Sequence, residues 1–247
     1  MTLLRFRVCI GAALLAFSSD GVLAGDAHSP SRPEIQTLST KEWTRLIAYH
    51  KAQLSVRRAD VCFVGDSLTA FWTHQGANAW REQFRGWTLV NCGIAADCTE
   101  HILFRLQSLD LAKAKPRALV LLMGTNNLSK EPPDPPAEVA KACETAIDFI
   151  QKASPETRIL LLTIPPNTYE AKSPLRRDIR ATNELLVKLA GRRDVPVVDT
   201  YPLFTDANDT WLTGFTLDGT HFSPDGYEVL ADAIRPKLVE ILGAPQK

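Results

Sequence analysis

Residues 61–69 read Val-Cys-Phe-Val-Gly-Asp-Ser-Leu-Thr. The first half is an unbroken apolar run that ends at Gly65, which is typical of a buried parallel strand. The second half brings Ser67 to the point where the chain leaves the sheet. In an open α/β sheet, ligands bind in the crevice beyond the carboxyl ends of the strands. Ser67 is therefore a candidate nucleophile, provided that a base and oxyanion donors reach it.

Outward from this stretch, apolar runs alternate with segments of helical periodicity. Strands are predicted at residues 61–64, 88–92, 118–123, 159–163 and 197–199. Helices are predicted at residues 38–56, 78–84, 173–190 and 223–242. Another helix is predicted to have Thr99 as its N-cap, and one more follows the prolines of residues 132–136 and ends near Ala153. The alternation predicts a parallel sheet between two layers of helices, joined by right-handed crossovers. We therefore expect a three-layer α/β/α sandwich.

The first residues have the pattern of an export signal. Arg5 and Arg7 precede an apolar run over residues 8–17, and Val22-Leu23-Ala24 fits a signal-peptidase site. The alternative is a membrane anchor, but the run is too short to span a bilayer comfortably. We predict a secreted or periplasmic protein. Its predicted parts are a cleaved signal peptide over residues 1–24, an N-terminal tether and helix over residues 25–57, and one domain over residues 58–247.

Composition excludes several partners. The chain has 247 residues, and 26 basic and 27 acidic residues follow residue 24. A nearly neutral chain has neither the basic patch that nucleic acids require nor a polybasic membrane patch, so we expect no nucleic acid partner and no stable membrane insertion. The spacing of Cys62, Cys92, Cys98 and Cys143 matches no zinc pattern, so no metal is expected. We expect no disulfide between Cys92 and Cys98.

Polar clusters follow the first three predicted strands, and a fourth cluster precedes the last helix. They are Gly65-Asp66-Ser67-Leu68, Gly93-Ile94-Ala95-Ala96-Asp97, Gly124-Thr125-Asn126-Asn127 and Asp218-Gly219-Thr220-His221. Each cluster alone is more typical of a turn or a helix cap. Together they are expected at one edge of one sheet, because parallel strands end on the same side.

These clusters contain the groups that acyl transfer needs. His221 is the candidate base for Ser67, and Asp218 can accept a hydrogen bond from the imidazole and fix its tautomer. Attack on an ester produces an oxyanion that requires preorganised donors. The backbone N–H of Ser67, a backbone N–H from the loop after the second strand, and the side-chain amide of Asn126 can supply them.

The four clusters resemble the four signature blocks of the SGNH (GDSL-type) hydrolases, in the same order. Three stretches, Asn91-Cys92-Gly93-Ile94, Gly124-Thr125-Asn126-Asn127 and Trp80-Arg81-Glu82, are similar to the catalytic subunits of intracellular platelet-activating-factor acetylhydrolase and their bacterial relatives. The resemblance extends over residues 54–242. It implies a flavodoxin-like fold with a five-stranded parallel sheet in the order 2-1-3-4-5, and no cofactor or metal. It allows a homodimer.

One residue departs from the family pattern. In those relatives the second block reads Gly-x-Gly-Gly-Asp, and the glycine before the Asp gives the oxyanion N–H. Here that position is Ala96. Because the donor is a backbone group, alanine can supply it without strain if its φ is negative, and with strain if its φ is positive. The resemblance thus assigns the oxyanion hole to Ser67, Ala96 and Asn126.

The resemblance also implies a substrate. It favours acetyl or other short-chain esters, and the export signal favours an acetylated glycan or small molecule outside the cytoplasm. Leu68 and Thr220 are predicted to line the acyl site, and the proline-rich loop over residues 131–136 borders the crevice. Trp72, Trp80, Trp87 and Trp211 are each more typical of core or surface packing than of a sugar or lipid floor, and Trp72 and Trp211 are the better candidates for such a floor. Two alternatives are a long-chain lysophospholipase or thioesterase of the same fold, and a non-catalytic carbohydrate-binding protein.

Overall fold

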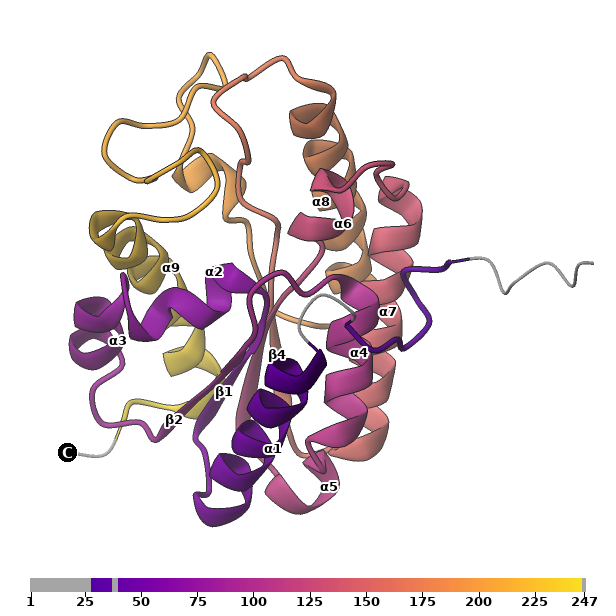
Figure 1. The fold of residues 1–247 in the computed structure, drawn as a ribbon. Coiled ribbons are helices and arrows are strands. Elements are labelled where there is room, and N and C mark those ends of the chain that lie inside the picture. The colour runs from indigo at the N-terminus through magenta and orange to yellow at the C-terminus, as the bar shows by residue number, and fades with distance from the viewer. Residues whose placement is uncertain (1–27, 37–39, 246–247) are drawn as a thin grey trace, which may run out of the picture.

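The structure is a computed structural model that describes residues 28–36 and 40–245. The predicted signal peptide lies outside these residues. One parallel sheet runs through the molecule (Figure 1) in the order β2-β1-β3-β4-β5. Its strands are β1 (Val61–Gly65), β2 (Leu89–Gly93), β3 (Ala118–Leu122), β4 (Arg158–Leu162) and β5 (Val197–Val198). The predicted fold class and strand order are confirmed.

Helices cover both faces of this sheet. They are α1 (Thr40–Val56), α2 (Ser67–Ala70), α3 (Ala77–Gln83), α4 (Thr99–Ser108), α5 (Leu111–Ala114), α6 (Thr125–Ser129), α7 (Pro136–Ala153), α8 (Pro174–Arg193) and α9 (Pro224–Leu242), with the 3₁₀ turns η1 (Phe71–Thr73) and η2 (Tyr201–Leu203). In Figure 1, α3 and α9 lie on one side of the sheet, and α1, α4 and α7 lie on the other.

Alternation along each strand divides the core into two layers. Cys62 and Val64 of β1 pack into the layer that also contains buried residues of α1, α4, α7 and α8. Val61 and Phe63 point the other way and pack with residues of α3 and α9. Successive strand side chains point to opposite faces, so a strand covered on both sides must be apolar throughout. Each fully buried side chain of this kind stabilises the fold by about 1.5–3 kcal/mol.

The segment predicted as a tether is in part packed structure. The hydroxyl of Thr99, at the start of α4, donates to the carbonyl of Pro30 at 2.8 Å. The backbone N–H of Glu34 donates to the carbonyl of Glu100 at 3.1 Å. Gln36 is buried. Residues 28–36 therefore lie against the loop and helix that follow β2.

Cys62, Cys92, Cys98 and Cys143 are free thiols, as expected for the pair Cys92 and Cys98. The sulfur nearest to Cys92 belongs instead to Cys62 on the neighbouring strand, at 3.7 Å.

Within the two described ranges, no helix has both the length and the apolar character that a membrane crossing requires.

Candidate active site

A glycine and a capping aspartate fix the position of Ser67. β1 ends at Gly65, where an added Cβ would lie 2.1 Å from Oγ1 of Thr69 and 2.5 Å from the carbonyl oxygen of Leu122. Only glycine allows so close an approach of backbone to backbone. Asp66 then caps α2, and its carboxylate accepts a hydrogen bond from the N–H of Leu68 at 2.9 Å. Ser67 follows as the first residue of α2.

Asp66 has no exposed surface. Burial raises the pKa of its carboxyl group to about 6, and the hydrogen bond from the N–H of Leu68 opposes this rise. The carboxyl is therefore mostly ionised at neutral pH, in the state that caps α2 best.

The structure brings Ser67, His221 and Asp218 together. Nε2 of His221 lies 3.0 Å from Oγ of Ser67, and Nδ1 of His221 lies 2.8 Å from Oδ2 of Asp218. Oδ1 of Asp218 also accepts the backbone N–H groups of Thr220, at 2.9 Å, and of His221, at 2.8 Å. An imidazole that donates from Nδ1 to a carboxylate presents an acceptor at Nε2, which suits it to take a hydroxyl proton.

The charge on Asp218 supports this arrangement. Partial burial acts to raise the pKa of its carboxyl group, but the hydrogen bonds from His221 and Thr220 prevail and hold that pKa below the usual range. Asp218 is therefore ionised at neutral pH and can stabilise an imidazolium at His221.

The loop that carries Asp218 and His221 is tied to its surroundings. The carbonyl of His221 accepts the N–H of Leu217 at 2.8 Å and the hydroxyl of Thr216 at 3.0 Å. The hydroxyl of Thr220 donates to Oδ1 of Asn167, in the loop after β4, at 2.6 Å. The turn between the two site residues thus has a fixed shape before any ligand arrives.

The candidate oxyanion donors come from three loops. Ala96 is exposed and has a φ of +62°. The side-chain amide of Asn126, on α6, donates to the carbonyl of Asp97 at 2.8 Å, which joins the loops after β2 and β3. Among the described residues, none accepts a hydrogen bond from the backbone N–H of Ser67 or of Ala96. These groups therefore remain available to a ligand.

A positive φ is strained for alanine, so glycine at position 96 is expected to stabilise the protein. Relief of this strain outweighs the entropy that glycine adds to the unfolded chain, and Ala96→Gly should raise the free energy of unfolding by about 0.5–1 kcal/mol. Because the proposed donor is the backbone N–H, kcat should stay the same. Denaturant unfolding and ester hydrolysis measure both quantities.

The control for this substitution is Ala95→Gly. Ala95 is exposed like Ala96, but its φ is not positive. Glycine there should therefore lower the free energy of unfolding by roughly 0.5–1 kcal/mol. A loss of stability in Ala96→Gly would contradict the argument that Ala96 is strained. A large fall in its kcat would contradict the role of the backbone N–H as the donor.

A buried ion pair stabilises the loop that contains Ala96. Nε of Arg105 lies 2.5 Å from Oδ2 of Asp97, and neither side chain is exposed. The other guanidinium nitrogens donate to the carbonyls of Cys92, at 2.6 Å, and Gly65, at 2.8 Å. Oδ1 of Asp97 accepts Nε1 of Trp43 at 2.8 Å. The pair therefore connects the carboxyl ends of β1 and β2 with the loop that contains Ala96.

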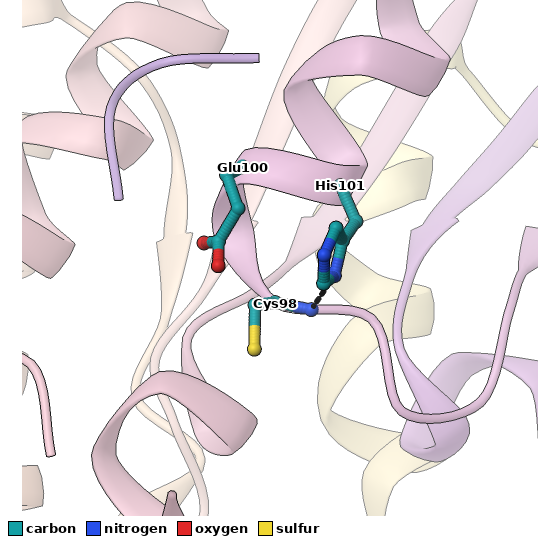
Figure 2. Close-up of side chains that lie close together, drawn as sticks. All are labelled: Cys98, Glu100 and His101. Carbon is teal, nitrogen blue, oxygen red and sulfur yellow. Dashed lines mark hydrogen bonds between the residues drawn. The ribbon is translucent and has the colours of Figure 1, made fainter. Parts of the chain in front are cut away.

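Cys98, Glu100 and His101 place potential metal ligands within 4.8 Å of one another. Their contacts, however, are those of a helix cap. The N–H of Cys98 donates to Nδ1 of His101 at 2.9 Å (Figure 2). Burial and the nearby Glu100 raise the pKa of the Cys98 thiol to about 12, so the thiol stays protonated. Cys98, and not Thr99 as predicted, is the cap of α4.

His28, Glu100 and Asp134 form a second cluster of this kind. Here Nζ of Lys130 lies 2.7 Å from Oδ2 of Asp134 and 2.7 Å from Nε2 of His28. An ammonium group thus already supplies the positive charge that a metal ion would bring.

The prediction that Leu68 lines the acyl site is wrong, and Trp72 and Trp211 are core residues, which is the role that the sequence favoured for them. Leu68 is fully buried in the core, Trp72 is 1% exposed and packs on Phe63 and Tyr227, and Trp211 is 6% exposed. Leu68 and Trp72 therefore offer a ligand almost no surface, and Trp211 offers little. Thr220 keeps some accessible surface beside the triad.

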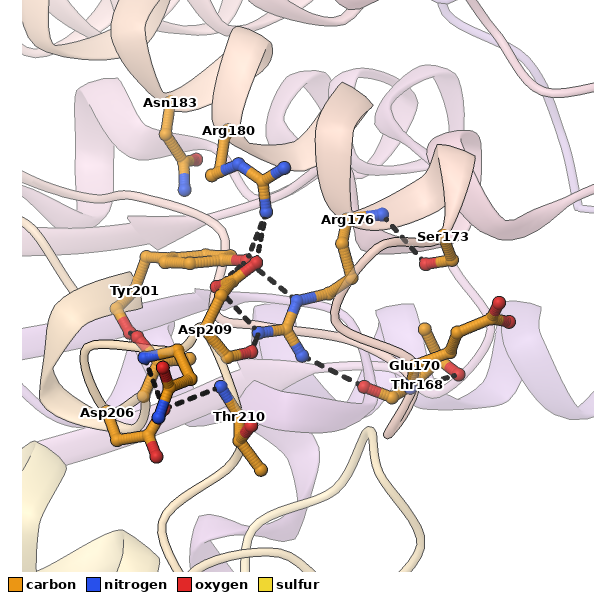
Figure 3. A network of polar contacts seen from close by, with 12 residues as sticks. Thr168, Glu170, Ser173, Arg176, Arg180, Asn183, Tyr201, Asp206, Asp209 and Thr210 are labelled. Carbon is orange, nitrogen blue, oxygen red and sulfur yellow. Dashed lines mark hydrogen bonds and ion pairs between the residues drawn. The ribbon is translucent and has the colours of Figure 1, made fainter.

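Two residues that the sequence analysis did not identify stand out. Arg176 is fully buried, and its guanidinium donates to Tyr201, Thr168 and Asp209 (Figure 3). Tyr169, next to Thr168, is 58% exposed. Its position in the sequence could have indicated a role, because Tyr169 follows the fourth predicted strand. The loops after the first three strands had already supplied candidate site residues.

Comparisons with known proteins find relatives over most of the chain. Residues 63–229 match the sequence profile of the GDSL-like Lipase/Acylhydrolase family. Platelet-activating factor acetylhydrolase IB subunit alpha1 of Rattus norvegicus is 28% identical over 91% of this chain and 95% of its own length. Subunit alpha2 of Bos taurus is 30% identical over 75% of this chain and 79% of its own length. The structure of a lipase/acylhydrolase from Enterococcus faecalis superimposes with a TM-score of 0.62 at 25% identity, covering 76% of this chain and 98% of that one.

Proposed function

Since this chain belongs to the GDSL-like lipase/acylhydrolase family and is a carboxylic ester hydrolase, we propose that it is a serine esterase that removes short acyl groups, above all acetyl, through Ser67, His221 and Asp218. The observation that carries the proposal is the chain of hydrogen bonds from Ser67 through His221 to Asp218, at 3.0 and 2.8 Å.

Each residue has one chemical role in this proposal. Nε2 of His221 takes the proton of Ser67 while Oγ attacks the ester carbonyl. When the tetrahedral intermediate collapses, the same nitrogen gives the proton to the departing alkoxide, and the acyl group stays on Oγ. His221 then takes a proton from water as the water attacks the acyl-enzyme, and it gives that proton to Oγ of Ser67 when the acid is released. Asp218 stabilises the imidazolium in both halves of the reaction.

The oxyanion of each tetrahedral intermediate would be held by the backbone N–H groups of Ser67 and Ala96 and by the amide of Asn126. Removal of one such donor usually costs about 3–4 kcal/mol of transition-state stabilisation. The hydrogen bond from Asn126 to the carbonyl of Asp97 supports this role, because it fixes the orientation of the amide.

The acyl group and the place of action are parts of the same proposal. The similarity to the acetylhydrolase subunits supports acetyl as the acyl group. The export pattern at the start of the sequence supports action outside the cytoplasm, on an acetylated glycan or small molecule.

Hydrolysis of p-nitrophenyl esters from acetate to laurate tests the proposal. We expect fast turnover of acetate, a steep fall by butyrate, and a loss of about a million-fold in kcat with Ser67→Ala. Ser55→Ala is the matched control, because Ser55 is exposed on α1. A rate that rises with chain length would replace the acetyl assignment with a lysophospholipase or thioesterase. Binding of acetylated glycan without turnover of any ester would favour the carbohydrate-binding alternative.

A further inference from the structure

An exposed aromatic side chain lies beside the triad. Tyr169, in the loop between β4 and α8, is 58% exposed. A Cβ built on Gly219 would lie 3.2 Å from Cδ2 and from Cε2 of its ring. Gly219 is the residue after Asp218, and Thr220 beside it is bonded to Asn167 in the same loop as Tyr169. The ring therefore packs on the turn that holds His221, and more than half of its surface stays open to solvent.

The loop under this ring is rigid and strained. Thr168 has a φ of +63°, which is an outlier for a β-branched residue. Two hydrogen bonds hold it there: its N–H donates to Oδ1 of Asn167 at 2.8 Å, and its carbonyl accepts Nη1 of Arg176 at 2.9 Å (Figure 3). Strain of this kind persists where surrounding contacts enforce it, and such places cluster at active sites and ligand clamps.

Arg176 anchors the same loop to the segment that leads into the triad. Its guanidinium donates to the hydroxyl of Tyr201 at 2.7 Å and to the carboxylate of Asp209 at 2.9 Å. Asp209 also pairs with Arg180 (Figure 3). Both loops beside His221 are thus fixed to one buried cation, so the open face of the Tyr169 ring is already oriented before a substrate binds.

The chemistry of the proposed reaction identifies what lies against this ring. His221 must deliver its proton to the oxygen of the leaving alcohol, so that oxygen must come within hydrogen-bond reach of Nε2. The alcohol part of the ester therefore lies on the His221 side of Ser67. The ring of Tyr169 packs on Gly219 in the turn that holds His221, so it lies on the side of the site where the leaving alcohol must receive its proton. Leu217, 53% exposed in the same turn region, adds apolar surface there.

We propose that Tyr169 binds the leaving alcohol, and that this esterase takes esters whose alcohol presents a flat apolar face, such as a pyranose or another six-membered ring. The inference rests on the proposed function. A ring that stacks on tyrosine gains dispersion and hydrophobic contact that a short linear alcohol cannot provide.

The test compares acetate esters that differ only in the alcohol. Ethyl acetate, cyclohexyl acetate and an acetylated methyl glucopyranoside are hydrolysed by wild type, Tyr169→Ala and Tyr169→Phe. For the two ring-bearing esters, Tyr169→Ala should raise KM about tenfold with kcat unchanged, because stacking acts equally on the bound substrate and the transition state. Ethyl acetate should be unaffected, and Tyr169→Phe should resemble wild type.

Tyr49→Ala is the matched control, because Tyr49 is 57% exposed on α1. An equal loss on all three esters would give Tyr169 a structural role and overturn the inference. So would an unchanged KM for both ring-bearing esters. In either case the proposed esterase activity, measured on wild type and Ser67→Ala, would still stand. If wild type hydrolyses no ester at all, the proposed function fails, and the inference fails with it.

Discussion

Replacing Ser67 with alanine is expected to lower kcat for p-nitrophenyl acetate about a million-fold while the protein stays folded. The substitution removes the nucleophile, so no acyl-enzyme can form. The substitution removes one oxygen, which contacts Nε2 of His221 and contributes nothing to the apolar core. The remaining activity should be the part that the oxyanion donors and substrate binding supply without a nucleophile, about a thousand-fold or more over water.

Two measurements make this result decisive. The melting temperature of Ser67→Ala should match that of wild type, which separates lost chemistry from lost structure. Ser55→Ala, exposed on α1, should keep full activity. If Ser67→Ala keeps more than about 1% of the wild-type kcat, a serine acyl-enzyme is not the main route, since serine hydrolases lose far more.

Arg105→Met is expected to have the largest effect on stability, lowering the free energy of unfolding by about 3–5 kcal/mol. Methionine fills much of the volume but leaves the carboxylate of Asp97 buried without its counter-charge. The carbonyls of Gly65 and Cys92 also lose their donor. Denaturant unfolding at neutral pH measures the loss.

The pH dependence identifies the cause of that loss. Burial already raises the pKa of Asp97 above its unfolded value, and Arg105 opposes the rise. Without Arg105 the folded pKa rises further, so the folded state binds more protons than the unfolded state between the two values. Stability then falls as pH rises through that window, and the deficit of Arg105→Met should be smaller near pH 5 than near pH 7.

Arg177→Met is the control for a surface ion pair. Arg177 is 70% exposed and pairs with Asp178 at 2.9 Å. Its loss should change stability by no more than about 0.5 kcal/mol. A deficit in Arg105→Met as small as that would mean that the buried pair contributes little, and a deficit independent of pH would point to packing and not to the charge of Asp97.

The sheet and the long helices could be predicted because each leaves a local signal. The run Val61–Val64 is apolar and ends at glycine, and Ser223-Pro224 marks the start of α9. α2, α5 and α6 were missed, because helices of four or five residues are too short to show a period of 3.6. β5 was predicted one residue too long.

The residue types of the site could also be predicted, because acyl transfer requires a nucleophile, a base and a carboxylate. The conformation of Ala96 could not be read, since the sign of φ depends on how the loop closes around Asp97 and Arg105. For Trp72 and Trp211 the sequence favoured packing but left a ligand wall open, because the residue type suits both roles, and only the structure shows that they are core. Tyr169 shows the opposite: its aromatic ring stays 58% exposed, and the sequence did not indicate this.

The two residues of the proposed proton-transfer pair lie 154 residues apart in the chain, with Ser67 after the first strand and His221 before the last helix. The hydroxyl of Tyr227 on α9 bonds the carbonyl of Leu68 at 2.8 Å, so the final helix docks directly on the turn that holds the serine. A refolding chain that has formed β1 to β4 therefore has most of its secondary structure and no turnover. Closing so long a loop is a slow, entropically costly step. Recovery of enzyme activity during refolding should therefore report the docking of the C-terminal segment, whereas circular dichroism should report the formation of helices and strands.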